Sequence, residues 1–390
     1  MKHNTCPSCG SSRVEGFFEI KNAPVYSLVT VKSKEAALNV PRKDIELAFC
    51  NDCGFIYNWL YDTSVDYFTQ GYEDQQGFSK TFMQYLEGIS NDLINKYNLI
   101  GKNLIEIGCG KGDFINLITN LNGGKGIGID PAYEEGRQNN PNLRFIKEFY
   151  SPEHGKLPAD LILCRHTLEH IHNTHGFLQT IRESLGSNAD PVIFFEIPQV
   201  MRILDIQAFW DIYYEHCSYF SPGSLARLFR ATGFEVLDLY KTYNDQYVAI
   251  EARPVNGKIS DKIQPAEESI EELRELVNVF TSNITSQLND WEKKLSSLKE
   301  NKKKAVVWGG GSKSVGFLTN FDHIDLFKYV IDINPHMADN FIPGIGKQYK
   351  TPEFLKTYRP DVVIIMNGIY EKEITEQIHQ MGFKPEILTL

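Results

Sequence analysis

The stretch that decides the fold is Asn103-Leu104-Ile105-Glu106-Ile107-Gly108-Cys109-Gly110-Lys111-Gly112-Asp113. It consists of an apolar run followed by three alternating glycines. Such a run is typical of a buried parallel strand that turns sharply into a helix, because glycine alone lets the backbone pass close to a ligand. The sequence therefore predicts a site for a nucleotide-like ligand at this turn.

The spacing of the glycines indicates which ligand the turn holds. A dinucleotide-binding turn usually reads Gly-x-Gly-x-x-Gly. Here Gly108, Gly110 and Gly112 alternate strictly, and Glu106 stands two residues ahead of them. This Glu-x-Gly-x-Gly-x-Gly order resembles motif I of the S-adenosylmethionine-dependent methyltransferases. An NAD-type fold and a purely structural glycine turn are the alternatives.

A second apolar strand supports the resemblance. Residues 126–130 follow the glycine turn after one helix length and end in Asp130, an acid placed to accept both ribose hydroxyls. The resemblance implies S-adenosylmethionine as the cofactor. The cofactor-binding residues that it implies are Glu106, Gly108, Gly110, Gly112, Asp130, Pro131 and His166.

Length and charge limit the remaining possibilities. A chain of 390 residues is too long for one typical core, so two or three domains are expected. The formal net charge of −10 argues against a nucleic acid as the main partner and against a role at a membrane surface. The N-terminus lacks the apolar core of a signal peptide, and no run is long and apolar enough for a membrane span. We therefore expect a cytoplasmic protein.

Four of the seven cysteines form two Cys-x-x-Cys pairs, Cys6 with Cys9 and Cys50 with Cys53. In a reducing compartment such pairs indicate a metal rather than disulfides. Each pair makes a tight turn that points two thiolates at one spot, and four thiolates form the closed tetrahedral shell of structural zinc. We predict a structural Zn²⁺ here. The alternative is a nucleic-acid-binding ribbon, which the acidic balance of the chain disfavours.

The central part of the chain, about residues 98–253, alternates strands and helices in the manner of a mostly parallel sheet with helices on both faces. Just before it, residues 72–79 are polar, and we expect them to form a flap over the site. The fourth strand, residues 159–164, precedes His166 and His170. These histidines should border the cofactor, because ligands of open α/β sheets sit at the carboxyl ends of the strands. Each is as readily a hydrogen-bonded residue at a helix start as a catalytic one.

A second chemically dense stretch, residues 209–221, follows the strand at residues 191–198. Tyr213, Glu215 and His216 supply a phenol, a carboxylate and an imidazole within four residues. Proton transfer requires such groups, namely a base with a pKa near neutral, an orienting acid and a donor for a developing oxyanion. Taken alone, a cluster of this kind is more often structural than catalytic.

The C-terminal part begins with a charged amphipathic segment, about residues 265–304. Its apolar positions recur in steps of three and four, which marks one face of a long helix, either a connector packed on the core or a dimer seam. A strand and another glycine turn follow at residues 305–314 and indicate a second Rossmann-like domain. Backbone amides around Gly310 and Ser312, with Lys313, suit the phosphates of a nucleotide-linked substrate, unless the turn is only packing scaffold.

With all parts placed, the chain resembles the sugar C-methyltransferases that act on nucleotide-linked 4-keto deoxysugars. Members carry a zinc domain with two Cys-x-x-Cys pairs, a central methyltransferase domain and a Rossmann-like C-terminal domain. The family's Tyr-x-Glu-His-x-x-Tyr-Phe segment stands here at residues 213–220. Two stretches depart from the family pattern: residues 72–79, where relatives often have a tyrosine followed by serines, and residues 309–314, which often read Gly-Ala-x-x-Lys-Gly.

The resemblance implies an α/β fold in four parts. These are a zinc-binding domain (1–70), a Rossmann-like methyltransferase domain (71–255), a helical connector (256–304) and a C-terminal Rossmann-like domain (305–390). The implied partner is a nucleotide-linked keto-deoxysugar. The sugar, the nucleotide base (dTDP, GDP or CDP) and the oligomeric state, monomer or dimer, stay open.

The resemblance also implies the chemistry. Methylation of carbon requires a carbanion, which is accessible next to a carbonyl, so a 4-keto group acidifies the proton on C3. We expect His216 to remove this proton while Tyr213 or Tyr72 holds the enolate oxygen. Glu215 would orient the imidazole or bind a sugar hydroxyl, and His170 is a further catalytic candidate. The rival functions are an O- or N-methyltransferase of small molecules, a nucleic acid methyltransferase, and a non-catalytic binder with a relict cofactor site.

Overall fold

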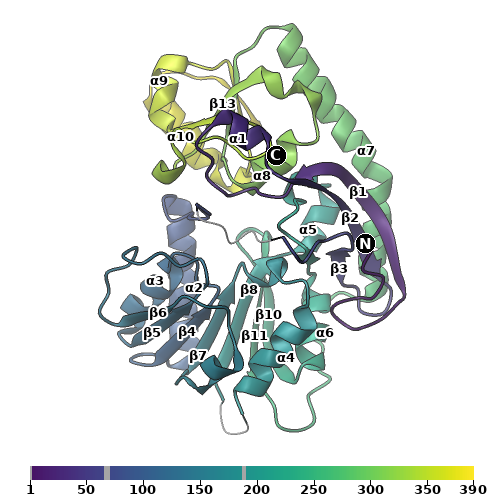
Figure 1. Ribbon diagram of the computed structural model, residues 1–390, viewed down its shortest axis with the longest axis vertical. Helices are drawn as coiled ribbons and strands as arrows, with labels where there is room; N and C mark the ends of the chain where they lie inside the picture. Colours follow the sequence, from purple (N-terminus) through teal and green to yellow (C-terminus); the bar gives the residue numbers. More distant parts are fainter. Residues whose placement is uncertain (1, 66–70, 187–189) are drawn as a thin grey trace.

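The computed structural model describes residues 2–65, 71–186 and 190–390. Within them the chain forms three β-sheets, of four, seven and five strands. Figure 1 shows the seven-stranded sheet with its helices in the lower part of the molecule and the five-stranded sheet in the upper part. The predicted α/β fold with two Rossmann-like sheets is confirmed. The predicted domain boundary after residue 70 lies outside the described residues.

The central sheet contains β4 (Asn103–Ile107), β5 (Lys125–Ile129), β6 (Leu143–Ile146), β7 (Leu161–Arg165), β8 (Val192–Pro198), β10 (Phe234–Thr242) and β11 (Tyr247–Pro254). Their order is β10-β11-β8-β7-β4-β5-β6. The chain adds β5 and β6 on one side of β4 and then β7 and β8 on the other, all parallel, while β11 is antiparallel to both of its neighbours. This reversal beside β4 creates the crevice in which open α/β sheets bind ligands.

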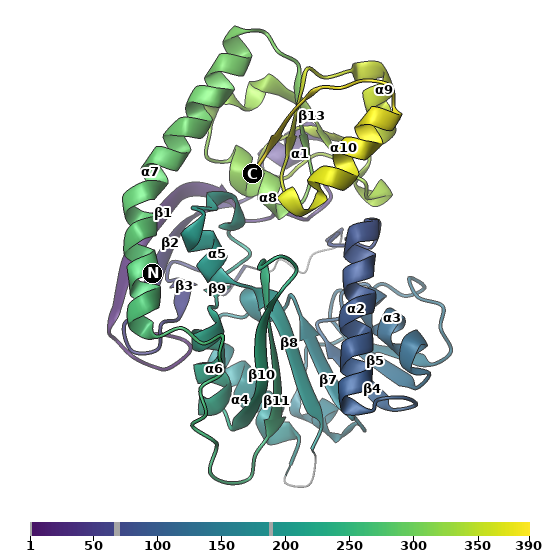
Figure 2. The same cartoon turned by 180° about the vertical axis from the view of Figure 1, so that it is seen from behind.

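Helices cover both faces of this sheet, because alternate strand residues point to opposite faces. Leu161 and Leu163 of β7 pack with two helices on one face, and Ile162 and Cys164 pack with two helices on the other. The first face carries α2 (Lys80–Tyr97) and α3 (Asp113–Asn122), and the second carries α4 (Thr174–Ser184) and α6 (Pro222–Ala231), as Figure 2 shows from behind.

The N-terminal sheet is antiparallel and consists, in order, of β1 (Val14–Pro24), β2 (Arg42–Cys50), β3 (Ile56–Asn58) and β9 (Ser218–Tyr219). Its last strand comes from much later in the chain and pairs Ser218 with Tyr57. The short helix α1 (Lys34–Leu38) leaves this sheet and lies against the C-terminal part (Figure 1). There the N–H of Gly344 donates to the carbonyl of Ala37 (2.8 Å).

The C-terminal sheet is parallel, has the order β14-β13-β12-β15-β16, and repeats the crevice arrangement around β12. Its strands are β12 (Ala305–Trp308), β13 (Phe327–Ile331), β14 (Gln348–Lys350), β15 (Val362–Ile365) and β16 (Glu386–Thr389). Its helices are α8 (Ser312–Leu318), α9 (Leu355–Tyr358) and α10 (Glu371–Gln380).

The amphipathic segment forms one long helix, α7 (Ile270–Glu300). It begins with a capping box in which Ser269 and Glu272 exchange hydrogen bonds. Its apolar face is buried inside the chain, since Leu273, Phe280 and Leu295 are at most 1% exposed. Figure 2 shows α7 running beside the N-terminal sheet and α5 (Val200–Asp205) toward the C-terminal sheet. No helix among the described residues combines the length and the hydropathy that a membrane span requires.

Candidate active site

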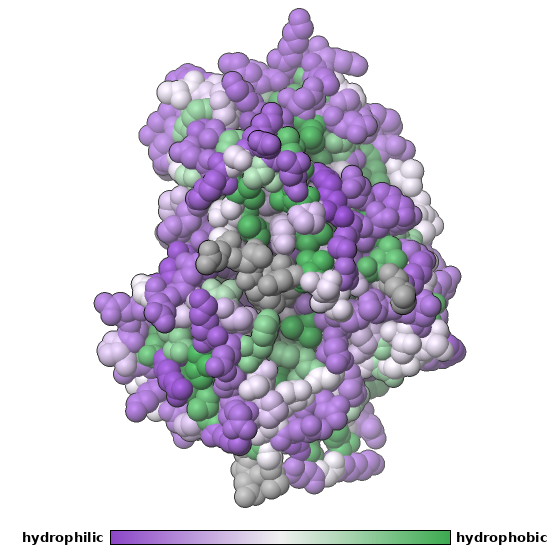
Figure 3. All heavy atoms as spheres, in the orientation of Figure 1, coloured by the Kyte–Doolittle hydropathy of each residue, from purple (hydrophilic) through white to green (hydrophobic). Residues whose placement is uncertain are grey.

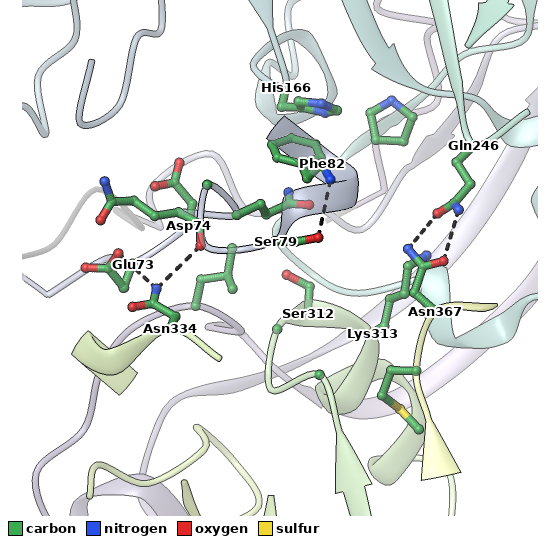
Figure 4. A pocket seen from close by; sticks show the side chains of 18 of the residues that line it. Glu73, Asp74, Ser79, Phe82, His166, Gln246, Ser312, Lys313, Asn334 and Asn367 are labelled. Atoms are coloured by element: carbon green, nitrogen blue, oxygen red, sulfur yellow. Dashed lines mark hydrogen bonds between the residues drawn. The ribbon is translucent and has the colours of Figure 1, made fainter. Parts of the chain in front are cut away.

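A cavity of about 410 Å³ lies between the carboxyl ends of the two parallel sheets. Its walls include the glycine turn after β4, the segment after β7, the turn after β12 and the polar loop of residues 72–79. In Figure 3 hydrophobic side chains gather between the upper and lower parts of the molecule, while the rest of this face is mostly hydrophilic. Figure 4 shows His166 and Phe82 on one side of the cavity and Ser312 and Lys313 on the other.

The glycine turn has the backbone that its sequence predicts. Gly108, Gly110 and Gly112 have φ angles of 70°, 52° and 81°, which residues with a side chain rarely adopt. A Cβ atom at Gly108 would lie 2.0 Å from Thr167 Oγ1, and one at Gly112 would lie 2.6 Å from the Phe145 ring. Gly108 and Gly110 line the cavity, so the backbone is open to a ligand there.

Two acids hold this turn in place. Glu106 is 3% exposed and accepts a hydrogen bond from a backbone N–H in the first turn of α3 (3.0 Å). Burial raises the pKa of Glu106 to about 8. Asp130 accepts from the N–H groups of Gly110 (2.8 Å) and Ala132 (2.7 Å). Glu106 lines the cavity, whereas Asp130 and Pro131 are not among its lining residues. Contact between Asp130 and a ribose therefore stays a prediction.

The polar loop of residues 72–79 lines the cavity and connects the two parallel sheets, in the position where a flap was predicted. Arg137, from the region after β5, donates to Gln75 (2.6 Å) and forms an ion pair with Glu73 (3.4 Å). Asn334, from the region after β13, donates to the other carboxylate oxygen of Glu73 (3.2 Å; Figure 4). Tyr72, a predicted catalytic residue, lines the same cavity.

Asp74 is a functional candidate that the sequence did not single out. A Cβ atom on Gly110 would lie 3.2 Å from Asp74 Oδ2, so the carboxylate faces the glycine turn. The surrounding protein and the charge of Asp130 raise the pKa of Asp74 to about 6. This carboxylate places negative charge where a cationic ligand would be bound. In the sequence, only the position of Asp74 in an acidic loop could have indicated a functional role, because the loop contains no motif with a characteristic residue spacing.

His166 lies between two buried acids. Its Nδ1 is 3.5 Å from Glu169 Oε1, and its Nε2 is 3.4 Å from Glu196 Oε1. Glu196 also accepts two hydrogen bonds from Arg165. Burial lowers the pKa of His166 well below its ordinary value, so the ring is neutral. His166 lines the cavity, and its contact with the cofactor stays a prediction.

The other predicted catalytic rings meet in the cavity. Tyr213 Oη lies 3.0 Å from His216 Nε2. The rings of His170 and His216 are 4.9 Å apart and nearly perpendicular, at 80°. Burial lowers the pKa of His216 well below its ordinary value, and the neighbouring His170 acts in the same direction. The imidazole of His216 is therefore neutral and has a lone pair that can accept a proton.

Backbone contacts fix the two segments that carry these rings. The N–H of Cys217 donates to the carbonyl of Glu169 (3.0 Å), and His170 Nδ1 donates to the carbonyl of Glu215 (3.0 Å). The first segment is the 3₁₀ turn η2 (Leu168–His170). The second runs directly into β9, which completes the N-terminal sheet. The N-terminal sheet thus supports the position of the candidate catalytic residues.

Glu215 differs from the other predicted catalytic residues. Its side chain is buried, and its carboxylate accepts from the N–H (2.8 Å) and the hydroxyl of Ser27. Glu215 is not among the cavity-lining residues, so a role for its carboxylate in orienting the His216 imidazole or binding a sugar hydroxyl stays a prediction. The side chain of the next residue, His216, lines the cavity, whereas the carboxylate of Glu215 is hydrogen-bonded to Ser27. Glu169 is the carboxylate that faces the imidazoles, with an oxygen within 4.8 Å of a nitrogen of His170 and of His216.

The predicted nucleotide subsite already makes contacts within the protein. The N–H of Gly310 donates to Asp332 (2.6 Å), and the hydroxyls of Ser312 and Ser27 are hydrogen-bonded (3.0 Å). The ammonium of Lys313 forms an ion pair with the carboxylate of Asp211. Ser312 and Lys313 line the cavity, whereas Gly310 is not among the lining residues.

Two cations share one carboxylate beside this turn. Asp211, in the 3₁₀ turn η3 (Phe209–Asp211), forms ion pairs with Lys313 and with Arg202 of α5 (3.4 Å). All three side chains line the cavity. The group therefore carries an excess of positive charge, which suits an anionic ligand. Arg202 was missed because nothing in the sequence distinguishes it from an ordinary surface residue of a helix.

The four predicted metal ligands form one cluster. Cys6 and Cys53 have their sulfurs 3.7 Å apart, and Cys9 and Cys50 have theirs 3.6 Å apart. None of the four forms a disulfide. A tetrahedral zinc ion with bonds of about 2.3 Å to sulfur requires edges of about 3.8 Å between the sulfurs. The cluster fits such an ion.

Two family models match the chain, one after the other. A methyltransferase domain matches residues 82–239, and a C-methyltransferase C-terminal domain matches residues 246–384. Among curated proteins, the chain is similar to the C-methyltransferase NovU of Streptomyces niveus, with 30% identity over 147 residues. This match covers 36% of the chain and 34% of NovU, so it spans about a third of the length of that relative.

Solved methyltransferase structures match about half of the chain at low identity. The magnesium protoporphyrin IX methyltransferase ChlM of Synechocystis PCC 6803 is 14% identical, covering 47% of this chain and 91% of that chain, with a TM-score of 0.35. A SAM-dependent methyltransferase from Aquifex aeolicus is 17% identical, covering 46% of this chain and 98% of that chain, with a TM-score of 0.32.

Proposed function

The chain belongs to the family of C-methyltransferases in which a methyltransferase domain precedes a C-methyltransferase C-terminal domain, and from this premise we propose that it methylates C3 of a nucleotide-linked 4-keto-6-deoxysugar. The methyl donor is S-adenosylmethionine. The observation that carries the proposal is the hydrogen-bonded pair of Tyr213 and His216, which lines the same cavity as the glycine turn. The pair offers a base and an acid to a carbon acid held beside a methyl donor.

The glycine turn and Glu106 hold the methyl donor in this proposal. S-adenosylmethionine, when bound, supplies a methyl group on a positively charged sulfur, which is an electrophile for carbon. Left-handed backbone at Gly108 and Gly110 leaves room for it. The carboxylate of Asp74, which faces Gly110, offers a counter-charge to the cationic groups of the cofactor.

Asp74→Asn is expected to weaken the binding of S-adenosylmethionine about ten-fold, or by about 1.4 kcal/mol. Because the pKa of Asp74 is raised to about 6, its carboxylate is neutral below that pH and charged above it. Binding should therefore tighten as the pH rises through about 6, and Asp74→Asn should remove this step while leaving any dependence on Glu106, whose pKa is raised to about 8. Isothermal titration calorimetry between pH 5 and 8 measures both effects. An unchanged pH profile in the variant would exclude Asp74 as the counter-charge.

The proton step is assigned to His216 and Tyr213. The neutral imidazole takes the C3 proton, which the neighbouring keto group acidifies. Tyr213 is hydrogen-bonded to His216 when no substrate is bound. When the substrate binds, the Tyr213 hydroxyl turns to the carbonyl oxygen and stabilises the negative charge that develops there. Tyr72 lines the same cavity and is the second candidate donor. The imidazole of His170 is held in position by its hydrogen bond to the backbone carbonyl of Glu215. These residues leave a C3 carbanion in an enclosed site beside the methyl donor.

The nucleotide part of the substrate is assigned to the turn after β12. Lys313 and Arg202 both lie at the cavity and share the single carboxylate of Asp211. A diphosphate carries two negative charges, so it can pair with both Lys313 and Arg202, whereas Asp211 offers these two cations a single carboxylate. The hydroxyl of Ser312 and the backbone around Gly310 are the further predicted contacts.

Arg202→Gln is expected to raise KM for the nucleotide sugar about ten-fold or more, with a smaller change in kcat, because it removes a contact made equally in the ground and transition states. Steady-state kinetics at fixed cofactor concentration measure KM and kcat separately. Arg253→Gln is the matched control, since Arg253 forms an exposed ion pair with Asp190 and does not line the cavity. A fall in kcat with KM unchanged would contradict the assignment.

The cysteine cluster is assigned to structural Zn²⁺. Four thiolates close the coordination shell and leave no position for water, so the ion would stabilise the N-terminal sheet and take no part in the reaction. Cys6, Cys50 and Cys53 are at most 7% exposed, which is typical of a structural site. The formal net charge of −10 disfavours a nucleic acid as the main partner, and the sugar nucleotide is the partner that we propose.

Incubation of the purified protein with S-adenosylmethionine and a panel of dTDP-, GDP- and CDP-linked 4-keto-6-deoxyhexoses tests the proposal by mass spectrometry. We expect one panel member to gain one methyl group, and the position of the methyl by NMR to be C3. A methyl group on oxygen or nitrogen would instead favour a small-molecule O- or N-methyltransferase. Binding of the cofactor without any methylated product would favour the non-catalytic alternative.

A further inference from the structure

We propose that Glu169, His170 and His216 bind a divalent transition-metal ion, and that the bound ion blocks the enzyme. One carboxylate oxygen and one nitrogen from each imidazole lie within 4.8 Å of one another. All three residues line the cavity, so an ion can reach them from solution without unfolding the protein. This site is separate from the cysteine cluster, whose four residues lie between Cys6 and Cys53 in the N-terminal part of the chain.

The donor atoms are those that transition metals select. Two imidazole nitrogens and one carboxylate oxygen bind Zn²⁺, Co²⁺ and Ni²⁺ and leave further positions for water or another ligand. Bonds of about 2.1 Å require donor atoms about 3.4 Å apart in a tetrahedral shell. The donor atoms, which lie within 4.8 Å of one another, therefore need to approach by up to about 1.4 Å on metal binding.

An unsatisfied carboxylate oxygen is the second observation that points to a cation. Glu169 is 3% exposed, and no described residue donates a hydrogen bond to its Oε2. A buried acceptor without a partner destabilises the fold. Arg165 does not supply the missing bond, because it donates to Glu196 instead. A metal ion would satisfy this oxygen.

The imidazole of His170 is held in the form that binds a metal. Its Nδ1 donates to the carbonyl of Glu215 (3.0 Å), which leaves the lone pair of the ring on Nε2. Metal-binding histidines commonly fix their second nitrogen to a backbone carbonyl in this way. The rings of His170 and His216 are nearly perpendicular, with centroids 4.9 Å apart, and a nitrogen of each ring lies within 4.8 Å of the other.

Inhibition follows from the same geometry and is the one part that rests on the proposed function. A metal ion on His216 uses the lone pair that the imidazole needs as a base. The ion also places a positive charge beside the position where a proton must arrive. Metal binding itself requires only the three donor residues and holds whatever reaction the enzyme catalyses.

Cobalt uptake tests the site directly. The purified protein, with its zinc content measured first, is dialysed against Co²⁺, and both metals are counted per chain while the absorption spectrum is recorded. We expect one additional Co²⁺ per chain with a spectrum free of thiolate-to-cobalt charge transfer. Glu169→Gln and His170→Asn should each bind this ion at least ten-fold more weakly. Glu215→Gln is the matched control, because its carboxylate contacts Ser27, and it should bind as the unaltered protein does.

Three outcomes would overturn the proposal: no uptake beyond the zinc content, uptake with thiolate bands, and uptake unchanged in both variants. Thermal unfolding shows whether the Glu169→Gln protein is folded. If it is not folded, the cobalt uptake of His170→Asn tests the site instead. Zn²⁺ should also reduce the methylation rate of the unaltered protein at lower concentrations than in Glu169→Gln, each relative to its own metal-free rate. Binding without inhibition would retain the metal site and reject His216 as the base.

Discussion

His216→Asn is expected to lower the methylation rate about 1,000-fold and to leave the affinity for S-adenosylmethionine unchanged. A positioned general base typically contributes about 10²–10⁴ to the rate. Asparagine is close to histidine in size and can still bond Tyr213, but it has no basic nitrogen. His216 is 6% exposed and lies in a preformed wall of the cavity, so the substitution changes the chemistry more than the packing.

Rate and binding are measured separately for this variant, by product formation under saturating substrate and by calorimetry with the cofactor. His172→Asn is the matched control, because His172 packs against His3 and Tyr61 and is not among the cavity-lining residues. The control should retain most of the activity. Retention of most activity in His216→Asn itself would exclude His216 as the base and direct attention to Tyr213 or Tyr72.

Cys50→Ser is expected to abolish zinc binding and to lower the thermal midpoint by about 10 °C or more, since structural zinc sites contribute directly to folding. Turnover should be lost as well. The reason is structural, because β3 pairs with β9, and β9 directly follows the segment that carries Tyr213 and His216. Loss of the metal would therefore displace the catalytic segment from the cavity.

Metal analysis, differential scanning calorimetry and the methylation assay measure these three effects. Cys164→Ser is the control, because Cys164 is equally buried but lies in the central sheet away from the cluster. It should keep its zinc and lose less stability. A Cys50→Ser protein with full activity would show that the N-terminal sheet does not position the site.

The sequence predicted the elements whose pattern is local. The alternating glycines required the left-handed backbone that Gly108, Gly110 and Gly112 have. The apolar steps of three and four predicted a helix over residues 265–304, and the structure has α7 at Ile270–Glu300. The two Cys-x-x-Cys pairs were expected to meet, and their sulfurs do. In the first two cases the spacing along the chain determines the geometry. The cysteine pairs also need the pairing of β1 with β2, because Cys6 and Cys53 are 47 residues apart.

The features that the sequence did not predict depend on distant contacts. Glu215 stands next to His216 in the sequence, yet its carboxylate is hydrogen-bonded to Ser27 of the N-terminal region and is not among the cavity-lining groups. Glu169 takes the place beside the imidazoles because a backbone bond to Cys217 joins two segments that are far apart in the sequence. Asp74 and Arg202 lie in a loop and on a helix without any motif. Their roles become apparent only when the two parallel sheets face each other across the cavity.

The central claim is that a carbon acid loses its proton in this cavity before it is methylated. The most direct test runs the reaction in heavy water with the accepting 4-keto-6-deoxysugar nucleotide and follows unreacted substrate by mass spectrometry and NMR. The account predicts deuterium at C3 of the unreacted substrate, dependent on the enzyme and absent in His216→Asn, together with a product that carries its new methyl group on C3. A methylated product whose new methyl group is on oxygen or nitrogen, with no deuterium entering C3, would contradict it.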